Sequence, residues 1–245
     1  MGLRLNVLMV IIALVPLLGG CCAIPLPLPA LTGSGRVVTI KGDFTGFDRL
    51  EVSNAFQVEV EQGDGYHVTV RIDDSLEEYL LLDRQGDTLR IELEPGHTYN
   101  LGGATLKATV QMPELVGLGL SGASRATLEG FESTKPLDVH VSGASQLRGE
   151  IEVGAGQLKA SGTSQIRLVG SGRDVTIDAS GASQVDLSRF EVDDAEIEAS
   201  GASTVSIHAA GRLDADASGA SRVRYRGEAS LGRIHTSGSS SVEPG

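Results

Sequence analysis

A four-residue motif, Ser-Gly-Ala-Ser or a near copy of it, recurs seven times in the second half of the chain. The copies begin at Ser121, Ser142, Ser161, Ser180, Ser200, Ser218 and Ser237, so successive copies are 21, 19, 19, 20, 18 and 19 residues apart. A fixed period of this length is typical of repeat architectures, in which each repeat is one structural unit stacked on the next. The period therefore constrains the fold more strongly than local propensity does.

Each copy lies between two short stretches in which apolar and polar residues alternate. In the fourth repeat, residues 175–179 alternate before the motif and residues 185–187 alternate after it. A period of two indicates strands with one buried face. Tight two-residue hairpin turns are absent from the repeats, so the two strands of one repeat are not expected to pair with each other. Coiling the chain instead stacks successive repeats as parallel strands around a shared interior.

The sequence therefore predicts an all-β, right-handed parallel β-helix with about 19–20 residues per rung, the hand following the preference of parallel crossovers. The repeats form the part 116–245. Residues 36–115 lack the motif but also alternate, and we expect them to supply starting rungs and an N-terminal β-rich cap of the same continuous domain.

The motif is interpreted as a structural corner, because glycine permits a positive φ and serine bonds to nearby backbone groups. Alternation traced back from the second strand places the last serine of each copy inward, so we expect an internal ladder of hydroxyls, each bonding a neighbour one rung away. The predicted corner glycines are Gly122, Gly143, Gly162, Gly181, Gly201, Gly219 and Gly238. The predicted inward serines are Ser124, Ser145, Ser164, Ser183, Ser203, Ser221 and Ser240.

The N-terminus is predicted to be a targeting segment. Arg4 precedes an apolar run, and Leu18-Gly19-Gly20-Cys21 resembles the lipobox of bacterial lipoproteins, so residues 1–20 are predicted to be a signal peptide and Cys21 the lipid-attachment site. An ordinary secretory signal or an uncleaved anchor is the alternative, and Cys22 competes as the acceptor. Residues 21–35, rich in Pro and then in Gly and Ser, are predicted to form a tether.

The composition excludes several classes of partner. A net charge of −12 argues against nucleic acid, which requires a basic face, and 4% aromatic residues with no Trp argue against stacking platforms. The outward faces are predicted to be acidic, so we expect an anionic sugar to be repelled. At the other end of the chain, Gly238, Pro244 and Gly245 blunt the last rung, or that rung docks on another subunit.

No catalytic site or cofactor is predicted. The motif lacks the Gly-x-Ser-x-Gly form of a nucleophile elbow, and the five histidines are scattered. A polysaccharide lyase needs long loops between strands, for which the even rungs leave little room. Stacking would place Asp178, Glu198 and Asp216 in one outward column, where Ca²⁺ is a candidate ligand, against the alternative of a solvated acidic face.

Several segments together resemble one known family. They are "FTGFDRLEVSNAFQVEVEQGD" from Phe44, "GDTLRIEL" from Gly86, "VQMPELVGLGLSGAS" from Val110, the repeat series, and "SRVRYRG" from Ser221. This region, roughly 36–245, resembles the putative auto-transporter adhesin, head GIN domain family. The resemblance implies a β-helical fold in a bacterial envelope protein and supplies no catalytic residues.

The predicted function is that of a non-enzymatic, lipid-anchored protein of the bacterial cell envelope, exported and adhesin-like, which binds an unknown protein or glycan. The alternative is a structural or regulatory envelope protein that binds a membrane partner or self-associates through its C-terminal rung. A polysaccharide-active enzyme ranks third.

Overall fold

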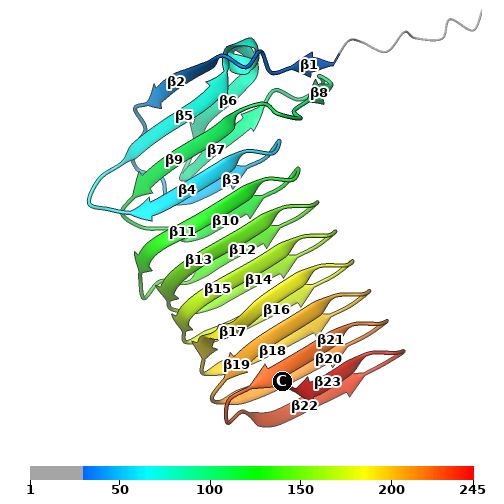
Figure 1. The fold of residues 1–245 in the computed structure, drawn as a ribbon. Coiled ribbons are helices and arrows are strands. Elements are labelled where there is room, and N and C mark those ends of the chain that lie inside the picture. Colours follow the sequence, from blue (N-terminus) through cyan, green and yellow to red (C-terminus); the bar gives the residue numbers. More distant parts are fainter. Residues whose placement is uncertain (1–29) are drawn as a thin grey trace, which may run out of the picture.

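The computed structural model describes residues 30–245, and the predicted signal peptide, Cys21 and the first part of the tether lie outside them. The described chain forms a parallel β-solenoid made of two long sheets that face each other across the core (Figure 1). This confirms the predicted fold class. Among residues 30–245, no helix has the length and apolar character needed to cross a membrane.

One sheet has ten strands and the other eleven. In spatial order, the ten-strand sheet contains β22 (Ser230–Thr236), β20 (Arg212–Ala217), β18 (Asp194–Ala199), β16 (Asp174–Ala179), β14 (Gly156–Ala160), β12 (Leu137–Val141), β10 (Gly117–Leu120), β3 (Arg49–Val52), β7 (Thr88–Leu93) and β6 (Leu80–Gln85). The eleven-strand sheet contains β2 (Val37–Gly42), β5 (His67–Asp73), β9 (Leu106–Met112), β4 (Gln57–Gln62), β11 (Arg125–Glu132), β13 (Gln146–Val153), β15 (Gln165–Gly172), β17 (Gln184–Val192), β19 (Thr204–Ala209), β21 (Arg222–Arg226) and β23 (Ser241–Pro244).

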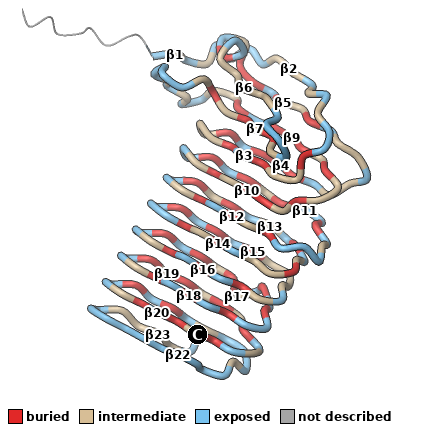
Figure 2. Tube along the Cα trace, turned by 180° about the vertical axis from the view of Figure 1, so that it is seen from behind, coloured by how far each residue is buried: buried red, intermediate tan, exposed pale blue. Residues whose placement is uncertain are grey.

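The core follows the alternation of the sequence. In β16, Val175, Ile177 and Ala179 are buried while the residues between them are exposed, and β17 begins with the same pattern. Buried and exposed residues alternate in this way along most strands (Figure 2). Each buried aliphatic side chain contributes roughly 1.5–3 kcal/mol, so a rung gains most of its stability from neighbours above and below.

Every copy of the motif forms the connection from the ten-strand sheet to the eleven-strand sheet, and we call these connections the SGAS corners. Each corner glycine has a positive φ, for example 73° at Gly181 and 71° at Gly201. A Cβ atom on Gly201 would lie 2.5 Å from the carbonyl oxygen of Gly181, because the corners stack directly. The corners also continue the backbone ladder, since the amide of Ala202 donates to Gly181 at 2.7 Å. Glycine is therefore required here for conformation and for close approach.

Six of the seven inward serines are buried and Ser240 is half-buried, but their hydrogen bonds differ from the hydroxyl ladder that the sequence suggested. Ser183 Oγ donates to the carbonyl of Ala160 at 3.2 Å, and Ser203 Oγ donates to that of Ala179 at 3.1 Å. The acceptor is thus the residue before the corner of the preceding rung, because a carbonyl oxygen that already accepts one backbone N–H has a second lone pair. Equivalent bonds are formed by Ser164, Ser221 and Ser240.

An additional corner, which the motif search missed, joins β3 to β4. It has the sequence Ser53-Asn54-Ala55-Phe56, with φ of 58° at Asn54 and 63° at Ala55. Asn54 takes the glycine position, since asparagine tolerates the left-handed region better than most residues. Phe56 takes the place of the inward serine and is fully buried. The solenoid therefore begins within residues 36–115, which lack the motif and are expected to supply starting rungs.

The N-terminal cap closes one end of the solenoid by strand reversal. β7 and β9 form the next layer beyond β3 and β4, although they come later in the chain. Beyond them, β5 pairs antiparallel with β9 and with β2, and β6 pairs antiparallel with β7. The short 3-10 helix η1 (Asp74–Tyr79) places Leu76 in the core with no exposed surface. The cap thus covers the end of the core with strands of opposite direction.

The last residues of the expected tether are packed against this cap. Leu31–Thr32 form β1, which pairs with β8 (Tyr99–Asn100). The amide of Gly35 donates to the buried carboxylate of Asp73 at 2.6 Å, and Ser75 Oγ donates to Thr32 at 2.8 Å. These contacts fix residues 31–35, so the tether predicted for 21–35 does not extend to Gly35.

Candidate binding surface

The solenoid presents two outer faces, one from each sheet, and they differ in charge. Because the strands are in register, outward residues stack in rows that run across the strands, along the length of the solenoid, with about 4.8 Å between neighbours. A row therefore contains one residue from each strand. The composition of the rows decides what each face can contact.

The ten-strand face carries carboxylates. Asp178, Glu198 and Asp216 are direct neighbours in one row, as the repeat spacing predicts, and Glu196 and Asp214 are neighbours in the row beside it. Lys159 and His235 flank these three carboxylates in the first row. Like charges at this spacing repel one another, so the centre of this face is strongly acidic.

Arginines on the same face neutralise part of this negative charge. Arg212 Nε lies 2.8 Å from Asp214, and Arg233 lies 3.4 Å from Glu196. The hydrogen bond from Arg212, together with the backbone N–H of Arg233, holds the pKa of Asp214 below its ordinary value of 3.8. Asp214 is therefore a structural partner of the arginines rather than a free ligand group.

The calcium hypothesis gains no support from the geometry. Asp178, Glu198 and Asp216 share a row, yet within residues 30–245 no group of three or more His, Cys, Asp or Glu side chains is arranged to hold a metal ion. A row of outward carboxylates on a flat sheet does not converge on one point, whereas Ca²⁺ needs several oxygens around it.

The eleven-strand face differs, and the expectation that the outward faces are acidic is wrong for it. That expectation rested on the first strand of each repeat, which forms only the ten-strand sheet. The row beside the SGAS corners, which we call the corner row, has one residue from each of the eleven strands and contains no acid. Its members in spatial order are Thr39, Arg71, Lys107, Gln57, Arg125, Gln146, Gln165, Gln184, Thr204, Arg222 and Ser241.

The adjacent row, two residues further along each strand, is the second row. Its acids are Glu59, Asp186 and Glu243, and the last two pair with arginines: Arg167 lies 3.1 Å from Asp186, and Arg224 lies 3.4 Å from Glu243. The full row is Lys41, Thr69, Thr109, Glu59, Thr127, Arg148, Arg167, Asp186, Ser206, Arg224 and Glu243. The two rows together thus carry more positive than negative charge.

A shallow groove of about 300 Å³ lies over these two rows where β5, β9, β4 and β11 meet. Its lining includes Arg71, Lys107 and Arg125 from the corner row, Glu59 from the second row, and threonines. Within residues 30–245, none of the three cations forms an ion pair, although Arg222 of the same row pairs with Glu243 at 3.6 Å. The groove therefore offers uncompensated positive charge beside hydroxyl groups.

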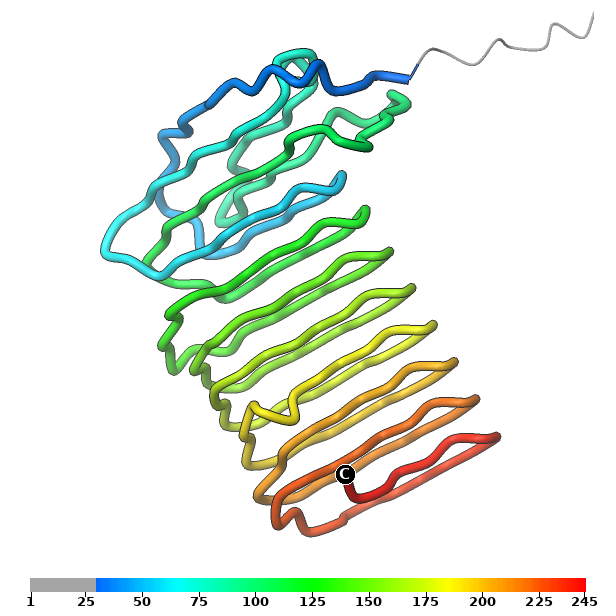
Figure 3. Tube along the Cα trace, in the orientation of Figure 1, coloured from blue at the N-terminus to red at the C-terminus, as the bar shows by residue number. Residues whose placement is uncertain are grey.

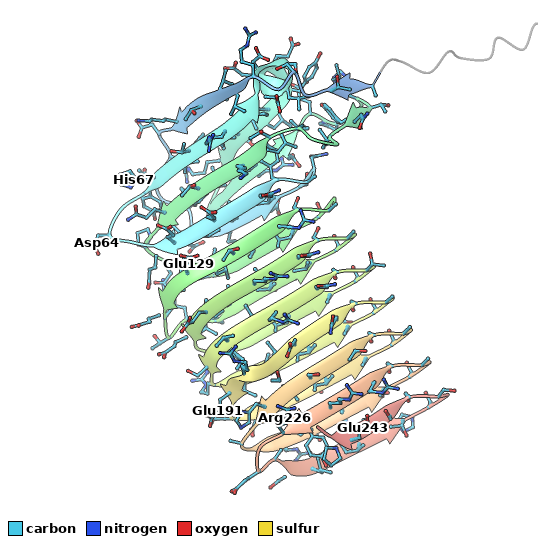
Figure 4. The ribbon with its side chains drawn as sticks, viewed as in Figure 1. Asp64, His67, Glu129, Glu191, Arg226 and Glu243 are labelled. Carbon is cyan, nitrogen blue, oxygen red and sulfur yellow. The ribbon has the colours of Figure 1, made fainter. Side chains whose placement is uncertain are left out.

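Beyond the second row, towards the opposite edge, the eleven-strand face becomes acidic again. Glu61, Glu129 and Glu150 stack in register there. Glu129 and Glu191 lie on this side of the sheet in Figure 4, away from the SGAS corners. The positive strip is consequently bounded by acids on one side and by the corners on the other.

The corner serines show no hydrolase geometry. Five of the seven inward serines bond to backbone carbonyls, and Ser124 and Ser145 have no hydrogen-bond partner among the described residues. In the part of the chain that the structure describes, no serine hydroxyl hydrogen-bonds a histidine. A serine nucleophile needs a base within hydrogen-bond reach. The motif is thus placed in the scaffold, and the outward rows remain as the candidate surface.

Comparison with known proteins gives a family and a fold. The sequence profile of the family described as putative auto-transporter adhesin, head GIN domain, matches residues 46–229. No curated protein sequence matches the chain. A crystal structure of a putative adhesin from Bacteroides fragilis is similar, with a TM-score of 0.81 and 14% identity, over 88% of this chain and 100% of that one.

Two further solved structures are similar over nearly their whole length. A putative adhesin from Parabacteroides merdae has a TM-score of 0.68 and 16% identity, covering 88% of this chain and 99% of that one. A putative lipid binding protein from Parabacteroides distasonis has a TM-score of 0.69 and 19% identity, covering 89% and 100%. At such identities the likeness establishes the fold alone.

Proposed function

The chain belongs to the putative auto-transporter adhesin, head GIN domain family, and from that premise we propose that it is a non-enzymatic, lipid-anchored protein of the bacterial cell envelope that binds a protein or glycan outside the cell. The observation that carries the proposal is the in-register outer face of the eleven-strand sheet. Its outward polar side chains, exposed or half-buried, stack in rows that run from β2 to β23 (Figure 4). Extended solenoid faces of this kind are suited to contact with an elongated partner.

Adhesion is tested with the full chain. Whole cells that produce it are compared with cells that lack it for adhesion to other cells, and the purified chain is used to capture material from the organism's own envelope extract. Adhesion that depends on the chain supports the proposal. Capture of self-derived envelope proteins without any gain in adhesion would reject it in favour of a structural or regulatory role.

The lipid anchor is tested at the two adjacent cysteines. We expect Cys21→Ser to abolish incorporation of labelled fatty acid and to release the chain from membranes, while Cys22→Ser keeps both. The two variants change the same atom at neighbouring positions, so they are matched controls. Loss of label in Cys22→Ser alone would move the attachment site, and label in neither wild type nor variants would remove the anchor.

Self-association through the C-terminal rung is the second candidate. All residues of β22 are exposed, and Leu231 and Ile234 expose 51% and 37% of their surface. Apolar side chains at an open strand edge favour pairing with a second edge. If this rung pairs two copies, Leu231→Lys with Ile234→Lys will convert a dimer into a monomer in light scattering. A wild-type monomer at high concentration would contradict it.

A further inference from the structure

We propose that the corner row and the second row of the eleven-strand sheet bind a single linear anionic glycan, which lies across the strands along the length of the solenoid and places its acidic groups on Arg71, Lys107 and Arg125. The inference rests on the proposed function and names the class of ligand. Its starting point is the contrast between this strip and a chain with 32 acidic and 20 basic residues.

Within residues 30–245, the cations of the groove have no ion-pair partner. Arg71 and Lys107 are direct cross-strand neighbours, and no ion pair within the described residues relieves either of them. Like charges placed directly opposite each other on a sheet are destabilising. The groove there is lined by both, together with Arg125. Such an arrangement is stabilised when an anion binds between the cations, because charge-assisted hydrogen bonds replace the repulsion.

The spacing of the cations along the corner row favours a polymer. Lys107 on β9 and Arg125 on β11 are two strands apart, with the neutral Gln57 of β4 between them. Their separation is therefore about 10 Å along the solenoid, twice the distance between strands. A polymer whose acidic groups recur with neutral units between them matches this alternation of cation, amide and cation.

The uncharged residues that continue the corner row also favour a glycan. Beyond Arg125 come Gln146, Gln165 and Gln184, stacked in register as an amide ladder. Amide side chains both donate and accept hydrogen bonds, as the hydroxyl groups of sugars do. The threonines beside the groove add further hydroxyls. The corner row therefore combines a cationic end with an uncharged hydrogen-bonding track, which suits a polyhydroxylated acidic chain.

The width of the strip favours a single polymer over a flat membrane as the ligand. Two rows span about 7 Å, the distance between alternate residues of a strand. The next row contains Glu61, Glu129 and Glu150, so an anionic bilayer lying on this face would meet acids as well as cations. A single extended chain contacts the positive rows and avoids the acidic one. Nucleic acid is disfavoured because the groove has no aromatic side chain to stack on bases.

The test measures binding of the full chain to hyaluronan oligomers, in which an acidic sugar alternates with a neutral one, and to dextran sulfate, with neutral dextran as the uncharged probe. The variant Arg71→Gln/Lys107→Gln/Arg125→Gln removes the three cations. The control Lys159→Gln/Arg173→Gln/Arg233→Gln removes the same charge outside the strip. We expect the first variant to lose about tenfold or more in affinity and the control to change less than about twofold, with wild-type binding falling as salt is added.

Equal losses in the two variants would overturn the inference, because net charge would then explain the binding. So would equal binding of neutral dextran, or no binding of either anionic polymer. Vesicles containing phosphatidylglycerol form another arm: a loss confined to vesicle binding in the first variant would replace the glycan by a lipid headgroup. If the first variant still supports cell adhesion while losing polymer binding, the glycan is not the adhesion ligand and the proposed function stands without it.

Discussion

The connections between the two sheets are regular along one edge of the solenoid and irregular along the other. At the SGAS corners, four residues join the sheets in every repeat from β10 to β23, and the corners stack evenly along one side of the molecule (Figure 3). At the opposite side, which we call the far edge, the connections are 133–136, 154–155, 173, 193, 210–211 and 227–229, so their lengths vary between repeats. Variation in repeat length is thus absorbed at the far edge.

The strands next to the far edge share this irregularity. The register shifts between Glu129 and Phe131, between Arg167 and Val169, and between Leu187 and Glu191 in the eleven-strand sheet, and between Leu213 and Ala215 in the ten-strand sheet. Bulges leave a residue unpaired and bend the strand locally. No such shift separates a strand from its SGAS corner. The corner therefore sets the register, and the far edge adjusts to it.

An inserted residue should distinguish the two edges most strongly. A glycine inserted between Gly181 and Ala182 disrupts the ladder in which the amide of Ala182 donates to Gly162 at 2.8 Å, and it shifts the register of β17. We expect a loss on the order of 5 kcal/mol or failure to fold. A glycine inserted between Glu228 and Ala229, both outside the strands, should cost less than about 1 kcal/mol.

Urea denaturation followed by circular dichroism measures both variants. The same added residue is used at the two edges, so a difference reports on position rather than on composition. Similar midpoints for the two insertions would show that the corner has no special role in register.

Glycine substitution gives the next largest effect and separates backbone conformation from close approach. Gly201 and Gly130 both have a positive φ, 71° and 73°. A Cβ atom on Gly201 would lie 2.5 Å from the Gly181 carbonyl oxygen, whereas one on Gly130 meets nothing within 4 Å. Gly130→Ala should therefore cost about 1 kcal/mol, from the left-handed conformation alone. Gly201→Ala should cost about 3 kcal/mol, since stacked backbone must also move.

Thermal and urea unfolding of the two alanine variants give the comparison. The contact with Gly181 is responsible only for the excess of the Gly201 variant over the Gly130 variant. Equal losses would mean that the corners tolerate a methyl group and that glycine is needed for φ alone.

The inward serines predict a smaller contrast within the corners themselves. Ser203 Oγ donates to Ala179, so Ser203→Ala should cost about 1 kcal/mol. Ser145 Oγ is buried and has no hydrogen-bond partner among the described residues, while the outer Ser142 Oγ contacts Leu120 at 3.4 Å. Ser145→Ala should be neutral or slightly stabilising, because it removes an unsatisfied polar group. Equal losses in the two variants would mean that Ser145 finds a partner in solution.

Sequence reasoning was most reliable where the repeat is strict. Seven equal corners and a period of two predicted the solenoid and the burial of Ser183, because both depend on local geometry repeated along the chain. The acceptor of the serine hydroxyl was missed, since it depends on how one rung sits on the next. The corner at Ser53–Phe56 was also missed, because asparagine and phenylalanine replace the glycine and serine of the motif.

The candidate strip could likewise be predicted only in part from the sequence. Arg125, Gln146, Gln165, Gln184 and Arg222 each follow the last serine of a corner, so their shared position was visible in the sequence. The place of Arg71 and Lys107 beside them was not, because β5 pairs antiparallel with β9, and β9 pairs in parallel with β4, out of chain order. Long-range strand order is what the period alone does not supply.

The smallest expected effect concerns Asp186, which accepts hydrogen bonds from Ser188 at the start of the β17 bulge. Partial burial raises the pKa of its carboxyl, but hydrogen bonds from the hydroxyl and amide of Ser188, together with Arg167, outweigh burial and set the pKa below the ordinary value of 3.8. A lowered pKa in the folded chain stabilises the fold at neutral pH, and this stabilisation is lost as the pH falls through the folded pKa.

Asp186→Asn should therefore cost less than about 1 kcal/mol at pH 7, since the pair is partly exposed. Urea denaturation at pH 7 and below 3.8 should show the gap between wild type and variant closing on acidification. A gap that stays constant would mean that the bulge depends on the shape of the side chain rather than on its charge, and that the irregular edge, like the corners, is held by packing and neutral hydrogen bonds.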